Sequence, residues 1–163
     1  MKQLLEKFYS AFQNLDAGEM VSCYHDEIVF RDPAFGELRG SRAGNMWKML
    51  CASQKGKDFQ VIFSDISVEG EVGKVHWEAF YTFGKSGRKI HNKIDATFKF
   101  KEGKIIEHVD QFNLHRWAGQ ALGMTGYVIG WTSYFRDKLN KQTNGILDRF
   151  EGDQKDCYKL KQQ

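Results

Sequence analysis

The sequence predicts an α+β domain in which a curved antiparallel sheet wraps around N-terminal helices, with an extra helix after the sheet. Apolar residues recur every three or four positions before residue 58, as in amphipathic helices. After residue 58 they alternate every second position through four long, aromatic-rich runs, as in strands. No Pro-, Ser- or Gly-rich linker divides the 163 residues, so we expect one domain.

Helices are predicted in the first third of the chain. Residues 4–15 carry an apolar face at helical spacing, formed by Leu4, Leu5, Phe8, Phe12 and Leu15. Asp16, with Glu19 three positions later, forms a capping-box pattern that predicts a second, short helix with Met20, Cys23 and Tyr24 on its apolar side. Ser41 begins a third helix, whose inward residues are Met46, Trp47 and Leu50.

Four strands are predicted from residue 58 onward. The apolar parity changes between Phe63 and Ile66, which predicts a bulge near residues 64–65. The turn K-E-G-K at 101–104 predicts a tight hairpin between the last two strands. The inward residues of the middle strands are Val75, Trp77, Ala79, Tyr81 and Phe83, then Ile90, Asn92, Ile94, Ala96, Phe98 and Phe100.

Composition excludes several classes of partner. The net charge of +3 is small and bases alternate with acids, so we expect no nucleic acid. The three cysteines are unpaired in spacing and the N-terminus lacks a signal-peptide pattern, which predicts a reduced, cytoplasmic protein. Glycine and polar residues interrupt the uncharged stretch 117–135, so we expect no membrane span. We also expect no metal and no cofactor, since neither metal-ligand spacing nor a glycine-rich phosphate loop occurs.

Asp32 is the first candidate for chemistry. It ends an apolar run and precedes Pro33, the only proline, which pushes Asp32 into extended geometry and so fixes where its side chain points. An acid aimed in this way at the end of a buried strand is a candidate general base. The alternative is that Asp32 accepts turn hydrogen bonds in D-P-A-F-G.

The last predicted strand supplies two more candidates, His108 and Asp110. Alternation places both on one face, between Ile106 and Phe112. On the concave face they would lie in an apolar cavity, where a carboxylate and an imidazole are suited to proton transfer near neutral pH. The alternative is a polar outer face whose apolar residues are covered by a partner subunit.

The remaining polar and aromatic residues divide between a pocket wall and the outer face. We expect the pocket wall to contain Trp77, Tyr81, Asn92 and Phe112, since aromatics supply contact area and one amide can orient a polar group. His91, Asp95 and Glu78 are interpreted as outer-face or dimer-interface groups.

The stretch G-K-I-I-E-H-V-D-Q-F-N-L at 103–114, with Q-A-L-G at 120–123, resembles the last strand of SnoaL-like polyketide cyclases. With the helices and the D-P-x-x-G segment, it places residues about 3–123 in the nuclear transport factor 2-like superfamily. The resemblance implies a cone with one deep pocket, usually in a homodimer. We therefore expect a domain at 1–123, a helical extension at 124–150 packing on it, and a flexible tail at 151–163.

The resemblance also implies roles for single residues. The cyclases use one aspartate on the last strand, which matches Asp110, and Asp32 matches the general base of ketosteroid isomerase. The tyrosine of that enzyme's oxyanion hole falls on Phe8, with Tyr9 adjacent, and its aspartate falls on Ala96. Phe8 and Tyr9 are therefore added to the substrate-binding set. Limonene epoxide hydrolase also matches through its last-strand carboxylate, but its R-x-D motif falls on W-E-A at 77–79.

The sequence thus predicts a cofactor-independent isomerase, cyclase or dehydratase for a small apolar molecule bearing a carbonyl or hydroxyl. Asp110 and Asp32 would move protons, and His108 would orient or polarise the substrate. The alternative is a ligand-binding or protein-interaction module of the same fold without turnover.

The segment after the sheet is predicted to end in an amphipathic helix. Thr132 can cap it, and its apolar stripe is Phe135, Leu139, Ile146, Leu147 and Phe150. Such a stripe must be buried, so the helix would serve as a lid, extend a dimer interface or lie on a membrane surface. We favour the first two roles.

Overall fold

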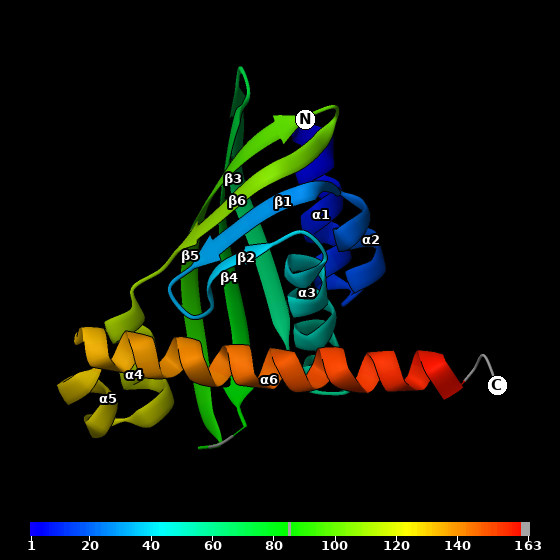
Figure 1. Ribbon diagram of the computed structural model, residues 1–163. Helices are drawn as coiled ribbons and strands as arrows, with labels where there is room; N and C mark the ends of the chain where they lie inside the picture. Colours follow the sequence, from blue (N-terminus) through cyan, green and yellow to red (C-terminus); the bar gives the residue numbers. More distant parts are fainter. Residues whose placement is uncertain (85, 161–163) are drawn as a thin grey trace.

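The computed structural model describes residues 1–84 and 86–160, with the side chains of 157–160 left out (Figure 1). In chain order the elements are α1 (Lys2–Gln13), α2 (Ala17–Ser22), β1 (Tyr24–Asp32), β2 (Gly36–Arg39), α3 (Ser41–Gln54), β3 (Gln60–Glu69), β4 (Val72–Phe83), β5 (Arg88–Lys101), β6 (Lys104–Gln111), α4 (Leu114–Leu122), α5 (Met124–Ile129) and α6 (Ser133–Leu160). The α+β class is confirmed.

All six strands form one curved sheet in the order β2-β1-β6-β5-β4-β3. Neighbours are antiparallel except β1 and β6, which run parallel. The expectation of a wholly antiparallel sheet is wrong at this pair. After β1 and β2 the chain crosses the helical face through α3 and enters the sheet at its other edge as β3, and β6 then returns to lie beside β1. The pairing sets Phe30 of β1 directly beside His108 of β6.

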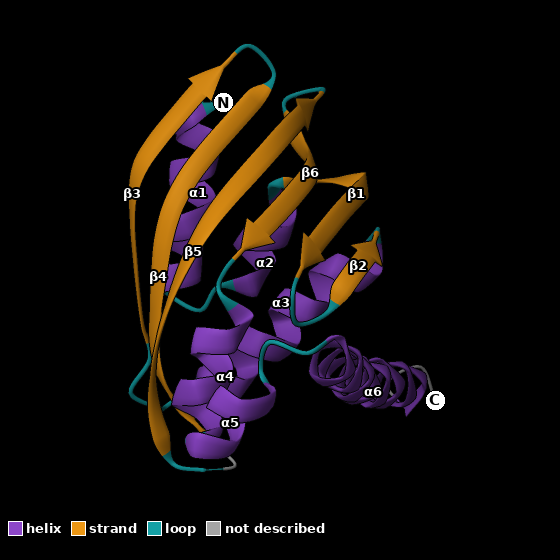
Figure 2. Cartoon of the chain, turned by 90° about the vertical axis from the view of Figure 1, so that its left-hand side faces the viewer, coloured by secondary structure: helices purple, strands orange, loops and turns teal. Residues whose placement is uncertain are grey.

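Helices α1, α2 and α3 lie on one face of the sheet, and the core fills the space between them (Figures 1 and 2). Helices α4 and α5 close one end, and α6 crosses beside β2 and α3. The fully buried side chains come from both layers, including Leu5, Phe8 and Tyr9 of α1, Met46 of α3 and Phe98 of β5. The inner face of the sheet is therefore buried in the core of the protein.

Several local predictions are confirmed. The backbone amide of Glu19 donates to Asp16 Oδ1 at 3.0 Å, capping α2, and the amide of Phe135 donates to Thr132 Oγ1 at 3.1 Å at the start of α6. The register of β3 against β4 shifts between Ser64 and Ser67. At the β5–β6 hairpin, the two central residues have φ of 52° and 76°, as a tight two-residue turn requires.

Other local predictions are wrong. Helix α2 ends at Ser22, so Tyr24 is a strand residue. A register irregularity beside Phe100 turns Ile105 inward, instead of Ile106. The predicted tail begins as helix, because α6 continues to Leu160, and residues 161–163 lie outside the described part. Helices α4 and α5 were not predicted; Asn113 caps α4 by accepting from the amide of Arg116 at 2.9 Å.

Candidate functional site

A chain of four hydrogen bonds runs through the interior from α3 to β4. Trp47 Nε1 donates to the Tyr24 hydroxyl at 2.7 Å, and this hydroxyl lies 2.7 Å from His108 Nδ1. His108 Nε2 lies 3.0 Å from Asp110 Oδ1, and Trp77 Nε1 donates to the same oxygen at 3.1 Å. His108 and Asp110 are 0% and 4% exposed, so this pair lies on the concave face. The alternative of a polar outer face is excluded for them.

The direction of each hydrogen bond follows from the chemistry of its partners. An indole N–H only donates, and a carboxylate only accepts. His108 Nε2–H therefore donates to Asp110, which leaves Nδ1 to accept the hydroxyl proton of Tyr24. Both ring nitrogens of His108 are engaged within the protein, so its clearest role is to hold Asp110.

Aromatic rings enclose the His108 imidazole. The ring of Phe98 lies 4.3 Å away between centroids, that of Phe30 5.1 Å and that of Phe8 5.6 Å, while Trp47 stacks at 6.0 Å. Because the surrounding side chains are close-packed, the imidazole cannot change orientation without displacing several rings. The position of Asp110 Oδ1 is fixed through it.

Two polar groups of the interior, the second oxygen of Asp110 and the hydroxyl of Tyr9, bear on the chemistry of this chain of hydrogen bonds. No hydrogen bond among the described residues ends on Asp110 Oδ2. The Tyr9 side chain is fully buried, and its hydroxyl has no partner in the described part of the chain. Burial raises the pKa of Tyr9 well above its usual value, and the negative charge of Asp110 raises it further. A proton donor is thus held within the field of a carboxylate.

Asp32 lies at the end of β1, where the proline-directed geometry was expected to aim it. Its Oδ1 accepts from the backbone amides of Ala34 at 3.0 Å and Phe35 at 2.5 Å, so the predicted turn hydrogen bonds are present. Burial raises its pKa to about 7; the amide of Phe35 opposes this and the charge of Asp110 adds to it. The backbone amide of Gly36 also stabilises the charged carboxyl. The turn interpretation and the acid–base interpretation therefore describe the same residue, because the carboxyl group that accepts the turn amides also has a pKa near neutral.

The remaining predicted residues occupy different places. Trp77 and Phe8 are 7% and 0% exposed and pack in the interior, where Trp77 fixes Asp110 and Phe8 packs on His108. Asn92 is half-buried on the inner parity of β5, opposite Ala79. The Tyr81 hydroxyl accepts from Trp117 Nε1 of α4 at 2.8 Å. Phe112 joins the main core to the cluster around α4.

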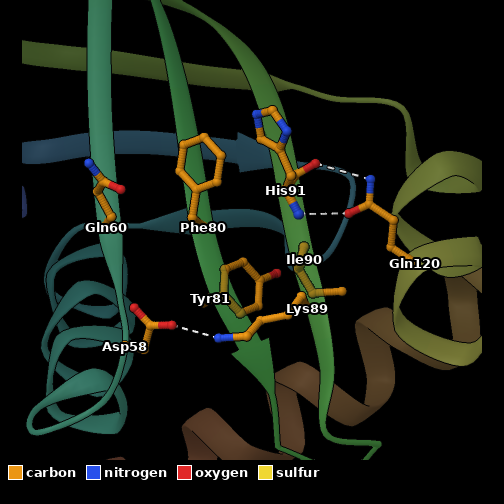
Figure 3. A pocket seen from close by; sticks show the side chains of 8 residues that line it. All are labelled: Asp58, Gln60, Phe80, Tyr81, Lys89, Ile90, His91 and Gln120. Atoms are coloured by element: carbon orange, nitrogen blue, oxygen red, sulfur yellow. Dashed lines mark hydrogen bonds and ion pairs between the residues drawn. The ribbon is translucent and has the colours of Figure 1, made fainter.

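The surface carries two open hollows that do not reach the polar chain. The first, of about 380 Å³, lies over β3, β4 and β5, where Gln120 of α4 bonds both backbone groups of His91 (Figure 3). The second, of about 530 Å³, lies between the α1–α2 turn, α3 and α6. Neither is lined by Asp32, His108 or Asp110. His108 and Asp110 are almost fully buried, so a substrate needs an opening to reach Asp110.

Tyr24 and Trp47 are members of the site that the sequence analysis missed. Both look like ordinary apolar positions in the helical pattern, and Tyr24 was assigned to the wrong element. The usable signal is their polar atoms, since a buried tyrosine hydroxyl or indole N–H needs a partner. In the described residues, no group of three or more His, Cys, Asp or Glu side chains could hold a metal ion, and no helix is both long and apolar enough to cross a bilayer.

Comparison with solved structures supports the fold. TerC co-crystallised with polyporic acid matches with a TM-score of 0.61 at 14% identity, over 73% of this chain and 95% of that one. An epoxide hydrolase of M. tuberculosis, of the LEH-like kind, matches with 0.58 at 21%, over 78% and 93%. A Catenulispora acidiphila protein with a ketosteroid isomerase-like fold, in complex with trimethylamine, matches with 0.60 at 10%, over 72% and 91%.

A search of curated proteins finds no match. The family model for the SnoaL-like domain, by contrast, matches residues 5–108, which span the sheet and helices from α1 into β6. The match includes Asp32 and His108 and stops two residues before Asp110. The predicted nuclear transport factor 2-like fold is confirmed by these neighbours, and the chain belongs to the SnoaL-like domain family.

Proposed function

We propose that this protein is a cofactor-independent acid–base enzyme, an isomerase, cyclase or dehydratase that acts on a small apolar molecule bearing a carbonyl or hydroxyl. One observation carries the proposal. Asp110 Oδ1 is fixed by Trp77 and His108, no hydrogen bond among the described residues ends on Oδ2, and the charge of Asp110 acts on the unpartnered hydroxyl of Tyr9. A fixed base within electrostatic reach of a free proton donor is the arrangement that enolisation needs.

In the proposed reaction, Asp110 Oδ2 takes a proton from a carbon next to the substrate carbonyl. The electron pair of the broken C–H bond moves onto the carbonyl oxygen, which accepts a hydrogen bond from the Tyr9 hydroxyl. The proton then returns to a second carbon, which completes an isomerisation. Alternatively, the enolate carbon attacks a second carbonyl and closes a ring; the electron pair of that C=O bond moves onto its oxygen, which takes the proton back from Asp110. His108 does not touch the substrate in this scheme and is a positioning residue.

Asp32 is the second proton carrier. Its pKa of about 7 leaves both protonation states populated near neutral pH, as a group that both gives and takes protons requires. The negative charge of Asp110 makes Asp32 harder to ionise and so helps to raise the pKa of Asp32. A dehydration would use Asp32 in its protonated form to release the hydroxyl as water.

A second candidate function is supported by the burial of the polar chain. His108 and Asp110 are almost fully buried, and the two hollows lie elsewhere. The same polar chain therefore suits a module that binds a ligand or protein partner and uses the hydrogen bonds only to fix its core. The two functions differ in one measurable respect, which is chemical change in the bound molecule.

The experiment is a thermal-shift screen of carbonyl-bearing polyketides, steroids and terpenoids, followed by mass spectrometry of each hit after incubation. Wild type, Asp110→Asn and Glu78→Gln are compared. Glu78 is the control, because it pairs with His76 on the outer face of β4 in the same histidine–x–acid pattern. We expect hits to bind all three proteins, with turnover lowered at least ~100-fold only in Asp110→Asn. Binding without product in wild type supports the second function, and turnover that survives in Asp110→Asn removes Asp110 from the mechanism.

A further inference from the structure

Helix α6 crosses the turn that carries Asp32 (Figures 1 and 2). Three of its side chains lie on one face, at spacings of three and four residues, and bond the backbone carbonyls of that turn. Asn140 Nδ2 donates to the carbonyls of Pro33 at 2.9 Å and Ala34 at 2.7 Å, and Asn144 Nδ2 donates to that of Phe35 at 2.8 Å. The carbonyl oxygen nearest to Thr143 Oγ1 is that of Ala34 at 2.8 Å, ahead of those of Asn140 at 3.0 Å and Leu139 at 3.1 Å on its own helix.

The same peptide groups bind α6 on one side and Asp32 on the other. The peptide that joins Pro33 to Ala34 offers its carbonyl to Asn140 and its N–H to Asp32. The next peptide, from Ala34 to Phe35, does the same. A hydrogen bond to a peptide oxygen polarises the group and makes its N–H a stronger donor, so the two sides are coupled.

We infer that Asn140 and Thr143 are positioning residues for Asp32, which hold its carboxylate through two peptide groups shared between α6 and the β1–β2 turn. Packing agrees with this assignment. A Cβ added at Gly36, the residue that ends the turn with φ of +75°, would come within 3.2 Å of Asn140 Oδ1, so helix and turn meet without a gap.

The charged groups around Asp32 do not account for the fixed position of its carboxylate. Asp110 from β6 repels a second negative charge. The neighbouring charges on β1 and β2, Arg31 and Glu37, pair with each other at 2.8 Å. The side chains that α6 presents to the turn carbonyls, those of 140, 143 and 144, are neutral.

A matched control exists on the same helix. Glu151 bonds Arg42 at 2.7 Å and Asn45 at 3.0 Å, both on α3, and does not contact the turn. Glu151→Gln therefore weakens the docking of α6 without removing a hydrogen bond to the turn. A change seen in Asn140→Ala but absent in Glu151→Gln belongs to the shared peptides and not to the general attachment of the helix.

The test measures two properties of the protein without substrate. The carboxyl ¹³C signal of Asp32, assigned with Asp32→Asn, gives its pKa, and amide exchange reports the N–H groups of Ala34 and Phe35. We expect Asn140→Ala to raise the pKa of Asp32 by about 0.5 or more and to speed both amides about tenfold. Thr143→Val, nearly the same shape as threonine, should give smaller changes in the same direction, and Thr143→Ser should restore wild-type values.

The inference is overturned by an unchanged or lowered pKa in the variants of 140 and 143, or by equal changes in Glu151→Gln. If Asn140→Ala does not fold, the comparison of Thr143→Val with Thr143→Ser decides whether the inference holds. The catalytic meaning of this positioning rests on the proposed function. The positioning and the catalytic role can be tested separately. If the variants of Asn140 and Thr143 shift the pKa of Asp32 while Asp32→Asn leaves turnover unchanged, the positioning is supported and the role of Asp32 in chemistry is contradicted.

Discussion

Strands β6 and β4 carry the same pattern on opposite faces of the sheet: a histidine followed two residues later by an acid. On the inner face of β6, His108 and Asp110 are 0% and 4% exposed and bond to neutral donors. On the outer face of β4, the His76 and Glu78 side chains are 29% and 15% exposed and lie 3.3 Å apart. Each pair is joined by a histidine–carboxylate hydrogen bond, so the difference lies in the surroundings.

The surroundings of the outer pair are ionic. Glu78 also bonds His91 and Lys93, and His76 Nδ1 lies 2.8 Å from Asp95. The hydrogen bond from His91 lowers the pKa of Glu78 to about 2, against some desolvation, with Lys93 and His76 acting in the same direction. Water and mobile cations can replace any of these partners. The inner pair has no such substitutes, which is why a change there reaches both structure and chemistry.

The largest contrast is expected from removing each histidine. His108→Ala leaves the Tyr24 hydroxyl and Asp110 Oδ1 short of a buried partner and opens a cavity among aromatic rings, so we expect a loss of roughly 3–5 kcal/mol in the free energy of unfolding. His76→Ala should cost at most about 1 kcal/mol. Urea unfolding with a common m-value measures both. Equal losses would show that the inner chain is not the stronger structural unit.

The next effect is the pH dependence caused by Asp32. Its pKa of about 7 lies above the ordinary value of 3.8, so between these pH values the folded protein holds a proton that the unfolded chain releases. Stability from this group is present at pH 4 and is lost as pH rises through 7. Asp32→Asn should therefore match wild type near pH 4 and exceed it by roughly 1–3 kcal/mol at pH 8. A constant difference across pH would contradict the raised pKa.

Sequence patterns predicted the strand that carries the inner pair and did not predict the side chains that surround it. Alternation placed His108 and Asp110 on one face correctly, because one strand has only two parities, but left open whether that face was the inner one. It could not reveal that Tyr24 and Trp47 complete the chain, since those contacts join β1 and α3 to β6 across the core. The irregularity that turns Ile105 inward is equally a product of pairing with β5.

The hydrogen bonds from α6 to the turn that holds Asp32 could not be predicted from the sequence, for a similar reason. Asn140 and Thr143 lie more than one hundred positions from the turn they bind, on a helix predicted only from its apolar stripe. Polar residues on a helix ordinarily indicate a solvated face. Only the crossing of α6 over the β1–β2 turn gives them partners.

A smaller gain in stability is expected from a change at Tyr9. Its hydroxyl is buried without a partner in the described part of the chain, and such a group costs stability. Tyr9→Phe should therefore raise the free energy of unfolding by roughly 0.5–2 kcal/mol while lowering turnover of any substrate found in the screen. Phe12→Leu, a change to a neighbouring core ring of α1, controls for altered packing. Loss of stability in Tyr9→Phe would show that the hydroxyl has a partner.

The smallest effect belongs to the outer acid. Glu78→Gln keeps the shape of the side chain and removes the charge that His91, Lys93 and His76 share. The lowered pKa of Glu78 means that its contribution is present above pH 4.5 and is lost as pH falls toward 2. Because each partner is partly exposed, we expect Tm at pH 7 to fall by no more than about 2–4 °C and the difference to vanish near pH 2. A drop as large as that of His108→Ala would mean that the sheet depends on its outer face as much as on its interior, and the contrast between the two His-x-acid pairs would fail.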